Sequence, residues 1–141
     1  MSEQATRKAA GLAGVLFLTL GIVGFVPEVT TGYTAFNTWS NAHAHLFGVF
    51  QISVMHLAFF VLFGLAGLRL APSVAGSRVY LTSGGFLFLA TAAYGFGFEF
   101  SGEANFLSLD RADNWADLGL GAAMLALGLV SVGAVRRPAT A

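Results

Sequence analysis

The chain has no cysteine among its 141 residues. Disulfide bonds, thiolate metal sites and thiol-based catalysis are therefore excluded. The sequence is also poor in charge: charged residues make up only 10% of it, and seven lysines and arginines balance seven aspartates and glutamates. Because there is no excess of positive charge, the net charge predicts no nucleic-acid partner.

Apolar residues dominate the rest of the sequence. Hydrophobic residues account for 56% of it, with 18 glycines and 14 phenylalanines. Because glycine is commoner in membrane helices than in soluble ones, this composition indicates a membrane protein and not an ordinary soluble domain.

Four long stretches are almost free of charged side chains. The hydrocarbon core of a bilayer, about 30 Å thick, is crossed by roughly 20 residues of apolar helix, with about 17 as the lower end. The stretches therefore predict an all-α four-helix transmembrane bundle that forms a single integral membrane domain over residues 1–141. Its helices are expected at about residues 9–26, 54–70, 79–98 and 113–135, with an outer loop and interfacial segment at 27–53.

The basic residues predict the orientation of this bundle. Six of the seven lysines and arginines fall on one side of the predicted membrane, and only Arg111 falls on the other. Because positively charged residues stay on the cytoplasmic side, the N and C termini are both predicted to be cytoplasmic. The six inner cations are Arg7, Lys8, Arg69, Arg78, Arg136 and Arg137.

The two halves of the chain resemble each other. The stretch "GVLFLTLGIVGFVPE" (residues 14–28) aligns with "GFLFLATAAYGFGFE" (residues 85–99) at an offset of 71 residues. The second and fourth helices align at an offset of 57, which places Gly64 on Gly121. Because each half contains two helices, both halves enter the membrane from the same side. The sequence therefore predicts two parallel-repeat helical hairpins, related by an axis along the membrane normal.

The same alignment places the start of the second helix. It sets Ser53 on Asp110 and His56 on Asp113, and an aspartate pair with this spacing is typical of a helix N-cap and the third helical position. His56 is then expected near the outer membrane boundary, and the preceding "HAHLFGVFQI" is an interfacial or re-entrant segment. The alternative is that residues 44–53 extend the second helix.

These motifs resemble a bacterial membrane family, domain of unknown function 4383. The resemblance covers most of the chain, through "LFGVFQISVMHLAFFVLFGLAGL" (residues 46–68) and "LDRADNWADLGLG" (residues 109–121). It implies a multi-pass four-helix protein of the bacterial plasma (inner) membrane. It implies no particular activity, because the function of the family is unknown.

In the pattern of that family, the second helix opens with Asn-x-x-His-Asn-x-x-His and the fourth with Asp-Asn-Trp-x-His. His56, Asp113, Asn114 and Trp115 match the pattern. Two of the four departures replace histidines of the pattern, so the resemblance does not imply an imidazole-based site in this chain. Ser53 and Leu57 stand for the two asparagines, and Phe60 and Asp117 for the remaining histidines.

The three histidines, His43, His45 and His56, all lie on one segment. A bis-histidine haem needs two imidazoles that face each other, usually from different helices, so the chain alone is not expected to hold a haem or another organic cofactor. The deep parts of the predicted helices carry hydroxyl groups and no charged side chain. A charge relay or a substrate carrier is therefore not expected.

The outer face offers a candidate site for a divalent metal ion, because the repeat brings acidic groups and His56 to similar depths. Carboxylates with a neutral imidazole suit zinc or another divalent ion. A simpler interpretation is that the aspartates cap a helix, the glutamates end helices in water, and His56 bonds to a carbonyl or an acid. The candidate metal ligands are His56, Asp113, Asp117, Glu99 and Glu28.

Glycines indicate how the helices pack. Small residues let helix backbones approach closely where hydrophobicity provides no net attraction between helices. The glycines expected to serve this purpose include Gly14, Gly21, Gly64 and Gly121.

The leading functional interpretation is a small integral membrane protein without catalysis of its own. It would act as an accessory or stabilising subunit of a membrane complex, or as a homo-oligomer. Its expected partners are the lipid bilayer and other transmembrane subunits or further copies of itself. The alternative is a metal- or ligand-binding membrane protein that uses the outer-face cluster of glutamate, aspartate and histidine.

Overall fold

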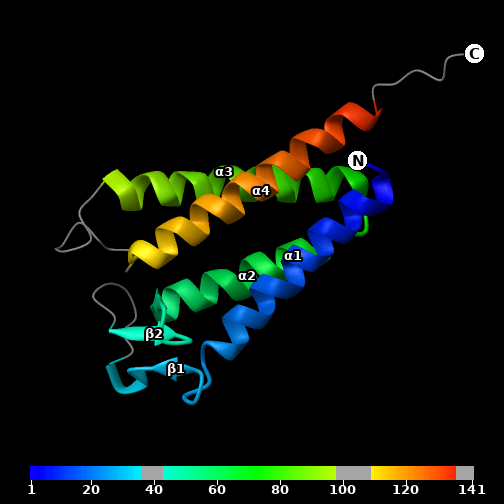
Figure 1. Ribbon diagram of the computed structural model, residues 1–141. Helices are drawn as coiled ribbons and strands as arrows, with labels where there is room; N and C mark the ends of the chain where they lie inside the picture. The colour runs from blue at the N-terminus through cyan, green and yellow to red at the C-terminus, as the bar shows by residue number, and fades with distance from the viewer. Residues whose placement is uncertain (36–42, 98–108, 136–141) are drawn as a thin grey trace, which may run out of the picture.

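A computed structural model describes residues 1–35, 43–97 and 109–135 of the chain. These residues form the four helices that the sequence predicts, in two antiparallel pairs (Figure 1). The first pair consists of the first two helices, which are connected through a small sheet, and the second pair consists of the last two helices. The helices are α1 (Glu3–Val23), α2 (Val54–Leu70), α3 (Val74–Gly97) and α4 (Arg111–Val135).

Three of these helices are long and apolar enough to cross a membrane: α1, α3 and the Arg111–Ser131 part of α4. Helix α2 is equally apolar but has 17 residues. At about 1.5 Å per residue it is about 25 Å long, shorter than a hydrocarbon core of about 30 Å. The prediction of membrane-spanning helices is thus supported by length and composition for three of the four predicted spans.

Caps extend two helices beyond the uncharged stretches. Helix α1 begins at Glu3 because the Ser2 hydroxyl accepts a hydrogen bond from the backbone of the first turn (3.2 Å). Helix α3 begins at Val74, where the Ser73 hydroxyl accepts from the Gly76 backbone N–H (3.0 Å). Both helices therefore begin before the uncharged stretches at residues 9 and 79, because the absence of charge marks the apolar core of a span and not the end of its helix.

A three-stranded antiparallel sheet in the order β1-β2-β3 follows α1, and the sequence analysis did not predict it. Its register pairs Thr30 with Leu46, and Leu46 in turn with Phe50. The alternative in which residues 44–53 extend α2 is therefore wrong. The elements are β1 (Thr30–Thr31), the 3-10 helix η1 (Tyr33–Ala35), β2 (Ala44–Leu46) and β3 (Phe50–Ile52).

The turn between β2 and β3 explains why this apolar segment leaves the helical conformation. Phe47 and Gly48 both have a positive φ, of 54° and 70°. Helical residues cannot adopt this conformation, and it suits a tight hairpin turn. The hairpin buries Leu46 and Ile52 against Leu57 of α2, which anchors the sheet on the end of the first helix pair.

Glycines bring α1 and α2 into backbone contact. A Cβ atom on Gly64 would lie 2.7 Å from the Leu18 Cα and 2.8 Å from the Gly14 carbonyl oxygen. One on Gly14 would lie 2.8 Å from the Leu68 nitrogen, and one on Gly21 would be equally close to α2. These distances are shorter than ordinary van der Waals contact, so only glycine fits.

Helices α3 and α4 pack in the same manner. A Cβ atom on Gly121 would lie 2.8 Å from the Leu89 nitrogen and 3.0 Å from the Gly85 carbonyl oxygen. One on Gly85 would lie 2.5 Å from the Leu125 nitrogen. The four glycines that the sequence singles out for packing thus lie in the contacts within the two helix pairs.

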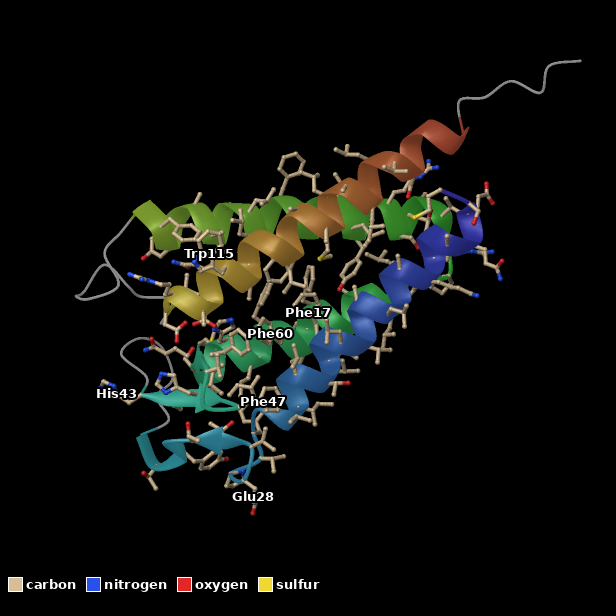
Figure 2. All side chains as sticks on the ribbon, in the orientation of Figure 1. Phe17, Glu28, His43, Phe47, Phe60 and Trp115 are labelled. Carbon is tan, nitrogen blue, oxygen red and sulfur yellow. The ribbon has the colours of Figure 1, made fainter. Side chains whose placement is uncertain are left out.

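Aromatic side chains fill the space between the two pairs. Phe17 stacks on Phe88, with ring centroids 5.0 Å apart, and meets the edge of Phe63 at 5.0 Å. Phe60 lies 5.5 Å from Phe17, and Figure 2 shows both rings between the pairs. This cluster forms the core that joins the two halves.

Hydrogen bonds of Ser131 connect α4 to α1 and α3 at the end of the bundle opposite the sheet. The Thr6 and Ser131 hydroxyls share a buried hydrogen bond of 2.9 Å between α1 and α4. The Arg78 guanidinium of α3 donates to the Ser131 carbonyl. The start of α1 and the end of α4 therefore lie at one end of the bundle, and the sheet lies at the other (Figure 1).

Candidate functional site

Reciprocal hydrogen bonds set the beginning of α4. The Asp113 backbone N–H donates to Oδ1 of Asp110, and the Asp110 backbone N–H donates to Oδ2 of Asp113, both at 2.9 Å. At the corresponding position of α2, the His56 backbone N–H donates to the Ser53 hydroxyl at 3.2 Å. These are the caps that the sequence predicts, and they place His56 in the first turn of its helix.

Asp113 has a second role. Its Oδ2 atom also accepts a hydrogen bond of 3.2 Å from the backbone N–H of Gln51 in β3. Asp113 is only 5% exposed, and both of its backbone donors lie at the end of the bundle that carries the sheet. Asp113 therefore links the small sheet to α4, which is a structural role.

The predicted metal ligands do not come together in the described part of the chain. No group of three or more histidine, aspartate and glutamate side chains is close enough there to hold a metal ion. Glu28 is exposed at the edge of the sheet and points away from the helices (Figure 2), and Glu99 lies outside the described residues. His43, the residue directly before β2, is also exposed.

A cavity of about 290 Å³ lies between α2 on one side and α3 and α4 on the other. Its walls are mostly apolar, and a large share of them is aromatic. Three polar side chains reach it near the sheet: Ser53 and His56 from the start of α2, and Asp117 from the second turn of α4. The other lining residues are Met55, Phe59, Phe60, Leu87, Phe88, Thr91 and Leu109.

Two of the polar groups have no hydrogen-bond partner among the described residues. The Nδ1 atom of His56 is buried and unpaired, and its ring meets the edge of Phe60 at 4.6 Å. Asp117 is 6% exposed, and no described side chain or backbone group donates to its carboxylate. Buried polar groups in proteins are usually paired, so the unpaired His56 Nδ1 and the Asp117 carboxyl group on one cavity favour a binding site over plain packing.

Asn114 is a further buried polar side chain beside this region. It is completely buried, and both atoms of its amide lack a partner among the described residues. It packs against Gly95 of α3, where any larger side chain would overlap the amide. This contact explains the need for glycine at position 95.

The sequence indicated His56 and Asp117 as site residues, and both line the cavity, but it did not indicate the apolar residues that surround them. Phe60, Leu87 and Phe88 come from two helices, and no local pattern distinguishes a cavity wall from ordinary core. The available signal was weak: an acidic residue on the buried side of an apolar helix, seven residues after the cap at Asp110.

The sequence model of the family described as a domain of unknown function (DUF4383) matches residues 7–130. The chain belongs to this family. No curated protein and no solved structure matches it. Membership in DUF4383 agrees with the predicted resemblance, and the description of the family names no reaction, ligand or partner.

The cavity also locates the departures of this DUF4383 member from the pattern it resembles. Three of the four departing positions, Ser53, Phe60 and Asp117, line the cavity together with His56. The fourth, Leu57, is buried against the sheet.

Proposed function

We propose that this protein is a multi-pass protein of the bacterial plasma membrane that acts, without catalysis of its own, as an accessory or stabilising subunit of a larger membrane complex. The observation that carries the proposal is the outward face of α4. Gly119 has no neighbour within 4 Å, and Ala122 and Ala126 on the same face are exposed.

This face differs from the outward faces of α1 and α2, which carry large side chains such as Leu12 (71% exposed) and Leu62 (67% exposed). Large apolar side chains suit contact with lipid. Small residues spaced three or four apart let a second helix approach closely, and in a bilayer such packing drives association. The docking partner is therefore a transmembrane helix of another subunit.

The two helix pairs support the inference that they are parallel repeats. A Cβ on Gly14 would meet the Leu68 nitrogen first, and a Cβ on Gly85 would meet the Leu125 nitrogen first. Gly85 follows Gly14 by 71 residues, and Leu125 follows Leu68 by 57, which are the offsets of the sequence alignment. With the basic residues on the inner side, this arrangement keeps both termini cytoplasmic.

Site-specific cross-linking tests the role of α4. Because the chain has no cysteine, Ala122→Cys introduces a single thiol. A photoactivatable maleimide attached there in native membranes is expected to form an adduct with another membrane protein. Leu62→Cys, on the outward face of α2, is the matched control and is expected to label lipid only.

A Gly119→Ile variant provides the second arm, since its side chain would fill the open face. The adduct at residue 122 is expected to disappear in this variant. An adduct with a second copy of the chain would replace the accessory role by a homo-oligomer. Equal labelling from positions 62 and 122 would refute docking through α4.

The other function predicted from the sequence was binding of a metal or another ligand at the outer face. The described residues favour binding of another ligand over binding of a metal ion. The cavity brings together one imidazole and one carboxyl group, His56 and Asp117, in mostly apolar surroundings. That set suits an organic molecule better than a divalent ion, which takes more ligands.

A further inference from the structure

We propose that the cavity between α2, α3 and α4 binds a lipid-soluble molecule with a single-ring apolar body and a hydroxyl group at its polar end, of the phenol or hydroquinone class. The inference is independent of docking through α4. It rests on the size of the cavity, on its walls and on the two unpaired groups at one end.

The size of the cavity limits the apolar body. An engineered apolar cavity of about 150 Å³ holds one benzene molecule. The volume here is about 290 Å³, which leaves room for one ring and a short chain. Phe59, Phe60 and Phe88 contribute aromatic surfaces, against which a ring packs in stacked or edge-on geometry.

The two unpaired groups select the polar end. The Asp117 carboxyl group offers hydrogen-bond acceptors, and the unpaired His56 Nδ1 accepts one hydrogen bond in the tautomer protonated at Nε2. A hydroxyl group donates to either of them. A carboxylate or phosphate head group would place negative charge beside Asp117 without a compensating cation, so fatty acids and phospholipid head groups are disfavoured.

The position of these groups gives the ligand an orientation. His56 lies in the first turn of α2 and Asp117 in the second turn of α4, so both are near the sheet. Leu87 and Phe88 lie further along the bundle, toward the Phe17 core. The hydroxyl group would therefore face the sheet and the ring would point toward the core.

The cavity can be reached from the side of the bundle. Three of its lining residues are also exposed on the outer surface of the helices: Met55 (40%), Phe59 (36%) and Leu87 (43%). A molecule dissolved in the bilayer therefore reaches the cavity between α2 and α3 without crossing the sheet.

The test compares two probes, of which only one has a hydrogen-bond donor; the other carries a methyl group in place of the hydroxyl hydrogen. Binding of 4-pentylphenol and of its methyl ether, 4-pentylanisole, is measured on the full-length protein in nanodiscs, with empty nanodiscs as the correction for partitioning. The phenol is expected to bind about tenfold more tightly, because a hydrogen bond from its hydroxyl group to an acceptor of the cavity is worth about that factor.

Two variants separate the polar end from the body. Asp117→Leu is expected to lower the affinity for the phenol about tenfold and to leave the affinity for the methyl ether unchanged. Retained binding of the ether also shows that the variant is folded. Leu87→Trp narrows the cavity and is expected to abolish binding of both probes, whereas Phe86→Trp, exposed on the same helix outside the cavity, is expected to change neither.

Equal affinities for the phenol and the ether in the wild-type protein would overturn the proposal, since the polar end would then play no part. Loss of both probes in Phe86→Trp as well as in Leu87→Trp would also overturn it, because binding would then not occur in this cavity. Binding of the phenol at the level of empty nanodiscs would do the same.

Discussion

The contact between α1 and α2 makes Gly64 the most sensitive small residue of the first helix pair. Replacement by alanine adds one methyl group, and its carbon would lie 2.7 Å from the Leu18 Cα and 2.8 Å from the Gly14 carbonyl oxygen. Both neighbours are backbone atoms, which cannot rotate away. The two helices must therefore move apart.

The magnitude follows from two opposing effects. Alanine favours a helix over glycine by about 1 kcal/mol. Overpacking a well-packed contact costs about 1–3 kcal/mol, and here it reaches the upper end because the helices separate along their length. Gly64→Ala is therefore expected to lower the free energy of unfolding by about 2 kcal/mol.

Gly119→Ala in α4 is the matched control. It makes the same chemical change inside a helix, but apart from the adjoining part of α4 itself no atom lies within 4 Å of the added methyl group. Only the propensity effect remains, so the free energy of unfolding is expected to rise by up to about 1 kcal/mol. The two variants should therefore differ by about 3 kcal/mol.

The assay is unfolding of the monomer in mild detergent by increasing amounts of a denaturing detergent, followed by circular dichroism. Equal midpoints for Gly64→Ala and Gly119→Ala would refute the close approach of α1 and α2. A stabilised Gly64→Ala variant would refute it more strongly, because propensity alone would then account for the result.

Three further predictions concern the ends of the bundle. Asp113→Ala should lower the free energy of unfolding by about 2 kcal/mol and speed hydrogen exchange at the Gln51 amide, since the cap and the link to β3 are both lost; unchanged exchange would argue against the link. An impermeant thiol reagent should label Glu28→Cys in whole cells and spare Ser73→Cys, and the reverse pattern would invert the proposed orientation. Ser131→Ala should cost about 1 kcal/mol, because the 2.9 Å hydrogen bond to α1 disappears, and equal stability of variant and wild type would count against that bond.

Local features of the sequence predicted much of the fold. The uncharged stretches predicted four helices, because an apolar helix satisfies its own backbone hydrogen bonds. Ser53 and Asp110 predicted two helix starts, since a cap acts within three residues of itself. Gly14 and Gly64 indicated where backbones would touch, although the sequence did not identify the atoms that they meet.

The sheet and the cavity depend on contacts between distant residues. Strands β1 to β3 are two or three residues long, and they exist because Thr30 and Leu46 pair although they are 16 residues apart in the sequence. Length and composition alone gave no sign of that pairing.

What the sequence by itself determined is the set of helices and their caps, because these depend on neighbours within one or two turns. Only the tertiary structure decided that His56 and Asp117 share a cavity while Glu28 stays outside it. The physical reason is that the rotation of each helix about its axis is set by the glycine contacts within each pair and the phenylalanine core between them. That rotation selects which polar side chains face each other.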